Sequence, residues 1–256
     1  MKIASWNVNS LNVRLPQVLQ WLESAQPDVL ALQETKLSDD RFPATEIEAA
    51  GYHVVFAGQK TYNGVALLSK APITDVLCDI PGLDDPQRRI LGATIDGVRV
   101  LNLYVVNGQE VGSDKFEYKL DWLDKVNAYL RQDLNAHSDY VVLGDFNIAP
   151  ADADVYDPEV WQERILCSTP EREALQRILD LGFRDSFRLF EQEEKTFSWW
   201  DYRLNAFRRN MGLRIDLILV SNTMASRCRS SVVDKAPRGW ERPSDHAPVI
   251  ATFEGA

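Results

Sequence analysis

YVVLGDFNIAP, residues 140–150, is the stretch from which the fold of this chain can be worked out. Its first four residues are apolar or aromatic and predict a buried strand that ends at Gly144. Side chains alternate along a strand, so Asp145 and Asn147 point the same way at its carboxyl end, where open α/β sheets place ligands. A carboxylate beside an amide suits a hard cation, a phosphate oxygen or an oriented water. A simple polar turn is the alternative interpretation of this stretch alone.

Similar strands, each followed by polar residues, recur along the chain. Strands are predicted at residues 2–6, 29–32, 52–57, 64–69, 90–95, 98–105, 197–200, 215–220 and 249–253. Helical spacing of apolar residues predicts helices at 15–22 and at 116–134, the second with Ser113 as its N-cap. Residues 151–169 are predicted as loop and short helix, and Thr169 opens a further helix that runs to Leu181. No linker divides the chain, so we expect one domain, residues 1–256, in which two packed, mostly antiparallel sheets are flanked by helices as a four-layered α/β sandwich.

Composition limits the classes of protein to consider. The chain has 45% hydrophobic and 26% charged residues, as soluble globular proteins do. Its net charge of -10 argues against binding nucleic acid through overall charge, although a local basic face can still do so. The three cysteines lack metal or redox spacing, and neither a secretory signal nor a membrane-spanning stretch is evident. We therefore expect a cytoplasmic protein.

Several predicted strand ends carry side chains suited to a metal ion or a phosphate. They are Asn7 with Asn9, Glu34, Tyr104 with Asn107, Asp145 with Asn147, Asp216, and Asp245 with His246. Together they predict one polar pocket at a common edge of the two sheets. Oxygen ligands without cysteines favour Mg²⁺ or Mn²⁺ over Zn²⁺. Carboxylates, a histidine and a hard metal fit metal-assisted attack of water on a phosphate ester.

Five segments, taken in order, resemble the exonuclease III family of abasic-site endonucleases and 3′-exonucleases, which have the DNase I-like fold. They are SWNVN at 5–9, LQETK at 32–36, GDFN at 144–147, LRID at 213–216 and SDHAP at 244–248. The resemblance implies a monomeric, Mg²⁺-dependent repair nuclease for double-stranded DNA with abasic sites or 3′ ends. A same-fold phosphatase of inositol phosphates or lipids is the enzymatic alternative. A catalytically inactive, nucleic-acid-linked regulatory protein is the other.

The resemblance also implies a metal site and a group that activates water. Glu34 resembles the principal Mg²⁺ ligand, with Asn7 and Asp245 beside it, and Mn²⁺ is expected to substitute. Asn9 stands where some relatives carry Asp and is assigned to substrate contact. Asp145 resembles the residue that activates or orients the attacking water.

Phosphate contacts are implied in the same way. His246 resembles the residue that binds the scissile phosphate, and Asp216 resembles the carboxylate that holds it. Tyr104 resembles a phenol that contacts the phosphate, and Asn147 resembles the orienting partner of Asp145 and a phosphate contact. Asn107 matches a further polar contact, in a segment where many relatives have a proline.

Apolar residues in the last third of the chain match a pocket for a flipped-out abasic sugar. Phe197, Leu213 and Ile215 carry this match, and ordinary core packing is the alternative interpretation. Trp199 and Trp200 are adjacent on a predicted strand, so we expect one of them to face the core; Trp200 is assigned to substrate binding.

A basic loop lies between these apolar residues. It is predicted to contact the DNA backbone through Arg208 and Arg209, and Phe207 or Met211 could wedge into the base stack. Four cations lie within twelve residues of this acidic chain and together suggest a contact with the DNA backbone or a groove; they are Arg203, Arg208, Arg209 and Arg214. A solvated loop is the alternative.

Overall fold

Two six-stranded sheets form the framework of the chain, of which the computed structural model describes residues 1–255. The first has the order β13-β14-β1-β2-β4-β3 and the second β5-β6-β7-β8-β12-β9. The first contains β1 (Lys2–Asn7), β2 (Val29–Gln33), β3 (His53–Ala57), β4 (Val65–Ser69), β13 (Cys228–Val233) and β14 (Val249–Phe253). The second contains β5 (Ile73–Leu77), β6 (Ile90–Ile95), β7 (Val98–Tyr104), β8 (Tyr140–Asp145), β9 (Phe183–Asp185) and β12 (Asp216–Ser221).

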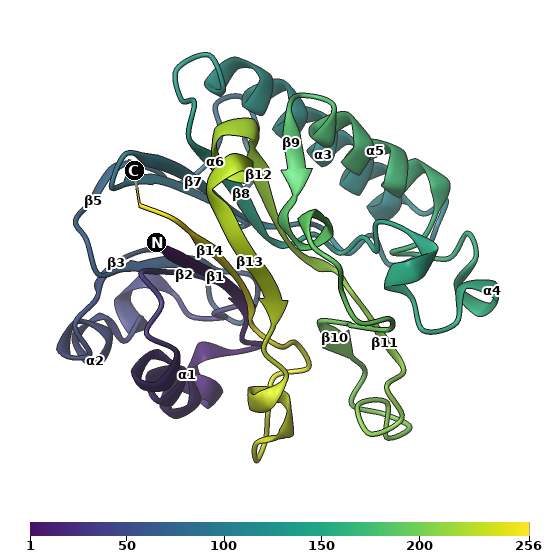
Figure 1. Ribbon diagram of the computed structural model, residues 1–256, viewed down its shortest axis with the longest axis horizontal. Helices are drawn as coiled ribbons and strands as arrows, with labels where there is room; N and C mark the ends of the chain where they lie inside the picture. Colours follow the sequence, from purple (N-terminus) through teal and green to yellow (C-terminus); the bar gives the residue numbers. More distant parts are fainter. Residues whose placement is uncertain (256) are drawn as a thin grey trace.

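The helices lie outside the sheets and complete four layers (Figure 1). α1 (Leu11–Ala25) and α2 (Ala44–Ala49) lie on the side of the first sheet, and α3 (Asp114–Asp133) and α5 (Thr169–Leu179) on the side of the second. Two short helices, α4 (Pro158–Trp161) and α6 (Asn222–Arg227), lie in connections. The predicted four-layered α/β sandwich is confirmed.

Each sheet contains one parallel strand pair among its antiparallel pairs. The parallel pairs are β1–β2 and β7–β8, and α1 and α3 supply the crossovers that parallel strands require. The prediction of mostly antiparallel sheets is therefore confirmed. A separate two-stranded ribbon joins β10 (Trp199–Trp200) to β11 (Gly212–Leu213), so the predicted strand at 197–200 is shorter than expected.

Apolar side chains fill the three spaces between the layers. Val100, Val141 and Leu143 pack between the two sheets, with residues of β1 and β14 opposite them. Separate clusters join the first sheet to α1 and the second sheet to α3 and α5. Full burial of each such side chain stabilises the fold by roughly 1.5–3 kcal/mol.

Local signals explain where the two long outer helices begin and end. The Ser113 hydroxyl accepts a hydrogen bond from the Phe116 N–H (3.1 Å), which confirms the predicted N-cap of α3. At α5 a capping box joins Ser168 and Glu171. This helix ends at Leu179, two residues earlier than predicted, and Gly182 in the following turn has φ +117°.

Four short strands and two short helices are additions to the predicted set. β5, β9, β11, β13, α2 and α6 are two to six residues long, and most of the residues of β5 are exposed. Edge strands that face solvent lack the apolar runs that identify the central strands.

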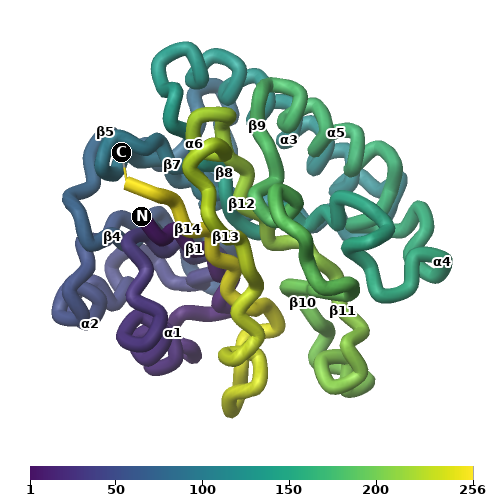
Figure 2. Tube along the Cα trace, in the orientation of Figure 1, coloured from purple at the N-terminus to yellow at the C-terminus, as the bar shows by residue number. Residues whose placement is uncertain are grey.

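The two termini lie close together (Figure 2), and the Phe253 N–H donates to the Met1 carbonyl (2.8 Å). Within residues 1–255, no helix combines the length and the apolar character needed to cross a membrane.

Candidate active site

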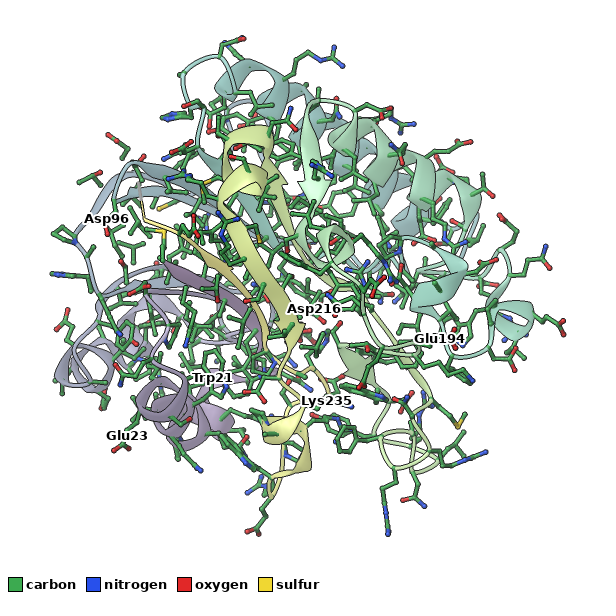
Figure 3. The ribbon with its side chains drawn as sticks, viewed as in Figure 1. Trp21, Glu23, Asp96, Glu194, Asp216 and Lys235 are labelled. Carbon is green, nitrogen blue, oxygen red and sulfur yellow. The ribbon has the colours of Figure 1, made fainter. Side chains whose placement is uncertain are left out.

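The register of the second sheet brings three predicted site residues together. Tyr104 at the end of β7 lies opposite Asp145 at the end of β8, and Asp145 lies opposite Asp216 at the start of β12. Asp216 lies in the interior of the molecule (Figure 3). Gly144 permits this arrangement, because a Cβ atom on it would lie 1.9 Å from the Leu103 carbonyl oxygen.

His246 is held against this row by Asp216. Its Nδ1 atom lies 2.8 Å from Asp216 Oδ2, which also accepts a hydrogen bond from the Ser198 hydroxyl (2.7 Å). The Ser198 oxygen in turn accepts the N–H groups of Ile215 and Asp216, both at 3.0 Å. The imidazole is therefore oriented by a carboxylate that is itself fixed, and its Nε2 atom faces Asp145 Oδ2 at 3.6 Å.

The buried charges shift one another's pKa values. Burial raises the pKa of Asp145 to about 7; the nearby His246 lowers it and Asp216 raises it. Burial alone would lower the pKa of His246, but Asp216 and then Asp145 raise it well above its ordinary value. His246 therefore carries its proton at neutral pH, while Asp145 is poised to accept one.

Glu34 and Asp145 meet at the junction of the two sheets. Asn7 donates through Nδ2 to Glu34 Oε1 (2.8 Å) and to Asp145 Oδ2 (2.9 Å), so one amide holds both carboxylates. Ligand atoms of Glu34, Asp145 and His246 all lie within 4.8 Å of one another and could hold a metal ion. The oxygen of Asn7 accepts from the Asn9 N–H (3.0 Å), so the ligand atom predicted for Asn7 is turned away from Glu34.

Asp245 and Asn9 lie at the more exposed side of this cluster. Asp245 accepts from Trp199 Nε1 (3.0 Å) and from Asn9 Nδ2 (3.2 Å). Lys36 donates to Asn9 Oδ1 (2.7 Å) and pairs with Glu34 at 3.3 Å. The structure thus brings Asn7, Glu34 and Asp245, the three residues predicted to bind metal, into one hydrogen-bonded group. Asp245 lies outside the set of Glu34, Asp145 and His246, whose ligand atoms lie within 4.8 Å of one another.

Tyr104, Asn107 and Asn147 lie on the side of Asp145 away from Asp216. Burial raises the pKa of Tyr104 well above its ordinary value, and the charges of Glu34 and Asp145 add to this effect, so the phenol keeps its proton. The Asn147 N–H donates to Asp145 Oδ1 (3.0 Å), and Asn147 Nδ2 donates to the Val105 carbonyl (2.9 Å). Asn107 Nδ2 lies 3.5 Å from Asn147 Oδ1. A neutral donor and two amides therefore border the carboxylate of Asp145.

Three of these residues have left-handed backbone conformations. The φ angles are 43° at Asn9, 52° at Glu34 and 48° at Asn147. Asparagine adopts this region with little strain, whereas for Glu34 it costs about 1 kcal/mol or more. The Glu34 carbonyl accepts the Ser10 N–H (2.8 Å), which helps to hold this conformation. Such strain is typical of functional sites, where neighbouring contacts fix a side chain in one direction.

The residues predicted to line a sugar pocket are buried in the free protein. Phe197, Trp200, Leu213 and Ile215 have exposed fractions of 0–1%, and they form two apolar clusters beneath the site. None of the four has accessible surface for substrate, so the assignment of Trp200 to substrate binding is corrected, and the burial of Phe197, Leu213 and Ile215 favours the alternative of core packing. Trp199, its half-buried neighbour, borders a cavity of about 400 Å³ and binds Asp245. Alternation of side chains along the strand allowed either tryptophan to face the core. The pairing of β10 with β11 decides that Trp200 is the one that faces it.

The arginine loop, residues 201–211, differs from the prediction at one end. Arg208 and Arg209 are exposed, as a DNA contact requires. Arg214, just beyond the loop, is buried and pairs with Asp154 (2.7 Å) and Asp185 (2.6 Å), so its predicted role in contacting DNA is wrong. Two carboxylates from distant parts of the chain accept hydrogen bonds from all three nitrogens of its guanidinium group.

The apolar residues of the arginine loop are also placed differently from one another. Phe207 packs edge-on against Trp200, with ring centroids 5.0 Å apart, and Arg238 lies over its other side. Met211 is half-buried, whereas Leu204 is 73% exposed. Leu204 is therefore more exposed than Phe207 and Met211 and is accessible to another molecule.

Ser198 and Trp199 are neighbours of the site to which the sequence analysis gave no role. Ser198 is completely buried and fixes the carboxylate that orients His246. The signal for both was the predicted strand at 197–200, which follows the alternating pattern and returns to pair with the segment of His246. The long-range pairing, rather than any local motif, makes these two residues part of the site.

The fold and this cluster define a class of metal-dependent hydrolases that act on phosphate esters. Residues 4–246 match the Endonuclease/Exonuclease/phosphatase family, and the chain belongs to it.

Similarity to individual proteins narrows this class. The exodeoxyribonuclease III of Haemophilus influenzae is 38% identical over 267 residues, covering 99% of this chain and 100% of the relative. A 3′-5′ exonuclease from Neisseria meningitidis has a TM-score of 0.98 and 53% identity, and an AP endonuclease from Archaeoglobus fulgidus has 0.96 and 38%; each comparison covers 100% of both chains. The predicted resemblance to the exonuclease III family is confirmed, and with it the DNase I-like fold and the assignment to phosphodiester hydrolases.

Proposed function

We propose that this protein is a Mg²⁺-dependent DNA repair nuclease. It hydrolyses the phosphodiester bond 5′ to abasic sites and removes nucleotides from the 3′ ends of duplex DNA. The observation that carries the proposal is the convergence of Glu34, Asp145 and His246, with ligand atoms within 4.8 Å, in a chain of this family. Neither a phosphatase of inositol phosphates nor an inactive binding protein is favoured by a comparable observation.

The residues of the site divide the chemistry between them. Asp145, with a pKa of about 7 and its Oδ1 held by the Asn147 N–H, accepts the proton of the attacking water. His246, kept charged by Asp216, donates to a phosphate oxygen where negative charge develops. Tyr104, held in its neutral form, and Asn147 add further donors.

The site fits a hard divalent cation. Glu34 and Asp145 present carboxylate oxygens within reach of one position, and no cysteine takes part in the cluster. Mg²⁺, with Mn²⁺ as a substitute, would be held by these oxygens, with Asp245 near the opening. When bound it supplies positive charge that polarises the phosphate and balances the charge of the leaving 3′ oxygen.

Activity at 3′ ends is supported by a second observation. Two Neisseria structures with TM-scores of 0.98 are titled a 3′-5′ exonuclease and a 3′ phosphatase bound to a product DNA hairpin, and they share 53% and 52% identity with this chain. Cleavage beside an abasic site and removal of a terminal group leave a 3′ oxygen in the same place. One site can therefore serve both kinds of DNA.

One set of assays tests the proposal. Duplexes carrying an abasic site, a recessed 3′ nucleotide or a 3′ phosphate are incubated with Mg²⁺, Mn²⁺ or EDTA, and Asp145→Asn serves as the inactive control. Cleavage of the first two substrates that EDTA abolishes is expected. Activity on the 3′-end substrates alone would remove the abasic-site part. Hydrolysis of inositol phosphates but of no DNA would overturn the whole proposal.

We also propose that the protein is monomeric, which analytical ultracentrifugation tests, and that it is cytoplasmic, which cell fractionation tests.

A further inference from the structure

Lys119 is a fully buried cation that the chemistry above does not use. It lies on α3, and its side chain is 0% exposed. Its ammonium group donates to the carbonyl oxygen of Asn147 (2.7 Å), to that of Asn107 (3.1 Å) and to the carboxylate of Glu171. All three N–H donors of the lysine are therefore used, and two of them hold the backbone of residues that border Asp145.

Glu171 extends these contacts to a third segment. It is also 0% exposed, and it accepts the N–H groups of Leu166 (3.0 Å) and Ser168 (3.1 Å) and the Ser168 hydroxyl (2.6 Å). The Leu166 carbonyl in turn accepts the N–H of Ala149, two residues beyond Asn147. The ion pair thus joins the Asn107 loop, the Asn147 loop and the turn before α5.

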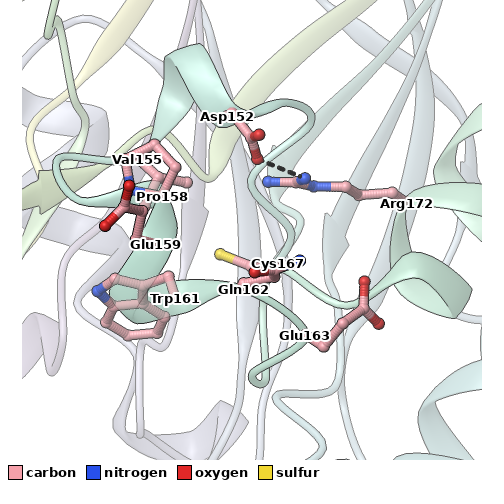
Figure 4. Close-up of a pocket in the computed structure, with 9 residues that line it drawn as sticks. All are labelled: Asp152, Val155, Pro158, Glu159, Trp161, Gln162, Glu163, Cys167 and Arg172. Atoms are coloured by element: carbon pink, nitrogen blue, oxygen red, sulfur yellow. Dashed lines mark hydrogen bonds and ion pairs between the residues drawn. The ribbon is translucent and has the colours of Figure 1, made fainter.

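Arg172 adds a parallel link on the outer side of the same segment. It donates through Nε to the Ala149 carbonyl (3.0 Å) and through Nη1 to Asp152 (2.9 Å), the contact drawn across the pocket in Figure 4. Gly108, with φ +90°, packs directly on Lys119, because a Cβ atom on it would lie 3.1 Å from the lysine Cδ. The loop after Asn107 is thus fitted closely to the lysine stem.

Stability alone is a weak reason for such a pair. Removing two charges from water costs several kcal/mol per ion, and well-packed apolar residues often replace buried ion pairs without loss of stability. Hydrogen bonds to two carbonyls beside the catalytic carboxylate, by contrast, fix where the Asn107 and Asn147 side chains stand. A displacement of about 1 Å in such groups can lower a rate 100-fold.

We propose that Lys119 and Glu171 are positioning residues, which set the separation of Asn107 and Asn147 and thereby the alignment of water and phosphate at Asp145. The inference rests on the proposed nuclease function. It predicts that the pair acts on turnover more than on substrate binding or on folding.

The test replaces both charges by uncharged side chains of similar length. Lys119→Met combined with Glu171→Gln should lower kcat on a recessed 3′ end about 10- to 100-fold, with KM changed less than about threefold. The matched control is Arg99→Met combined with Asp133→Asn. This control removes another largely buried ion pair, and its carboxylate, Asp133, lies at the end of α3 opposite to Lys119. The control should lose comparable thermal stability and keep its kcat.

A double-mutant cycle separates positioning from general damage. In an Asn147→Ala background the charge-removing pair should cost much less than in the wild type, because the group it positions is already gone. Equal cost in both backgrounds, or an unchanged kcat in the wild-type background, overturns the inference. If the double variant does not fold, Glu171→Gln alone is put through the same cycle. A wild-type protein that cuts no DNA overturns the proposed function and this inference together, whereas normal wild-type cutting with a fully active variant overturns only the inference.

Discussion

The cluster of Asp145, Asp216 and His246 and the arginine loop are opposites in physical terms. The three cluster residues are 1–4% exposed, and each has a fixed partner. The arginine loop, by contrast, exposes most of its charges and one leucine. In the interior a charge is effective because water does not screen it, and it is costly to leave unpaired. We therefore expect the chemistry of the site to depend on the rigid sheet edge, and DNA to be contacted by a segment that water can reach.

Charge is distributed according to the same division. The chain as a whole carries a net charge of -10, yet the arginine loop contains three arginines and one aspartate. Arg203 forms an ion pair with Asp201 (2.7 Å) within the loop. Arg208 and Arg209 are the exposed arginines of the loop that remain for contact with another molecule. A negatively charged protein can bind a polyanion when such a group of cations stands beside the site.

The largest effect should come from the buried region. Asp145→Asn keeps the shape of the side chain and removes the group that accepts the proton, so kcat should fall by about 10²–10⁴. Binding of abasic duplex, measured by fluorescence anisotropy, should stay close to that of the wild type, because the arginine loop is untouched. A variant that loses binding and turnover together would show that Asp145 has a structural role.

The next effect concerns the metal. Glu34→Gln removes one charged oxygen from the cluster, so the Mg²⁺ concentration for half-maximal rate should rise about tenfold or more, since loss of even an outer partner of a metal costs 10- to 100-fold in affinity. Calorimetric titration with Mg²⁺ measures this without substrate. Full activity at the ordinary Mg²⁺ concentration would contradict the assignment of Glu34.

A smaller change is expected when the partner of His246 loses its charge. Asp216 is the main group that raises the pKa of His246. In Asp216→Asn that pKa falls, so the histidine loses its proton, and the enzyme its activity, at a lower pH than in the wild type. The alkaline limb of kcat against pH should shift downward, while the acid limb, which follows Asp145, moves less. Identical profiles and rates would remove the pairing from the mechanism.

The sequence predicted the buried region better than the exposed one. The central strands are continuous apolar runs, and Asp145 at the end of β8, Asp216 at the start of β12 and His246 just before β14 meet because these strand ends lie along one edge. That reasoning brought Asp145, Asp216 and His246 together without knowledge of any contact.

The remaining features depend on pairing between distant segments. Arg214 lies 60 residues from Asp154 and 29 from Asp185, so a run of arginines looked like one basic surface although its last member is buried. Likewise, alternation gives two faces to Trp199 and Trp200 but does not say which face is the core. The link from Lys119 to Asn107 and Asn147 has no local pattern at all.

A moderate effect is expected from the cations of the arginine loop. Arg208→Ala combined with Arg209→Ala should weaken binding of duplex DNA and reduce the salt dependence of affinity, each lost phosphate contact changing the slope by about one. kcat at saturating DNA should stay the same, because no atom of the buried cluster moves. Affinity measured across a salt series checks both expectations, and an unaltered slope would place the DNA contacts elsewhere on the protein.

The smallest effect distinguishes Leu204, the exposed apolar side chain of the arginine loop, from Phe207, which packs against Trp200. A wedge into the base stack needs an accessible side chain, and at an abasic gap the stack is already interrupted, so insertion there costs less than in intact duplex. Leu204→Ala should therefore slow cleavage at abasic sites a few-fold and leave removal of 3′ nucleotides unchanged. Phe207→Ala removes a contact with Trp200 instead, so it should lower the melting temperature and affect both substrates alike. The comparison uses both substrates and a melting curve for each variant. If Phe207→Ala alone showed the abasic-specific loss, the loop would have to open on binding, and the separation between a rigid interior and an accessible loop would fail at Phe207.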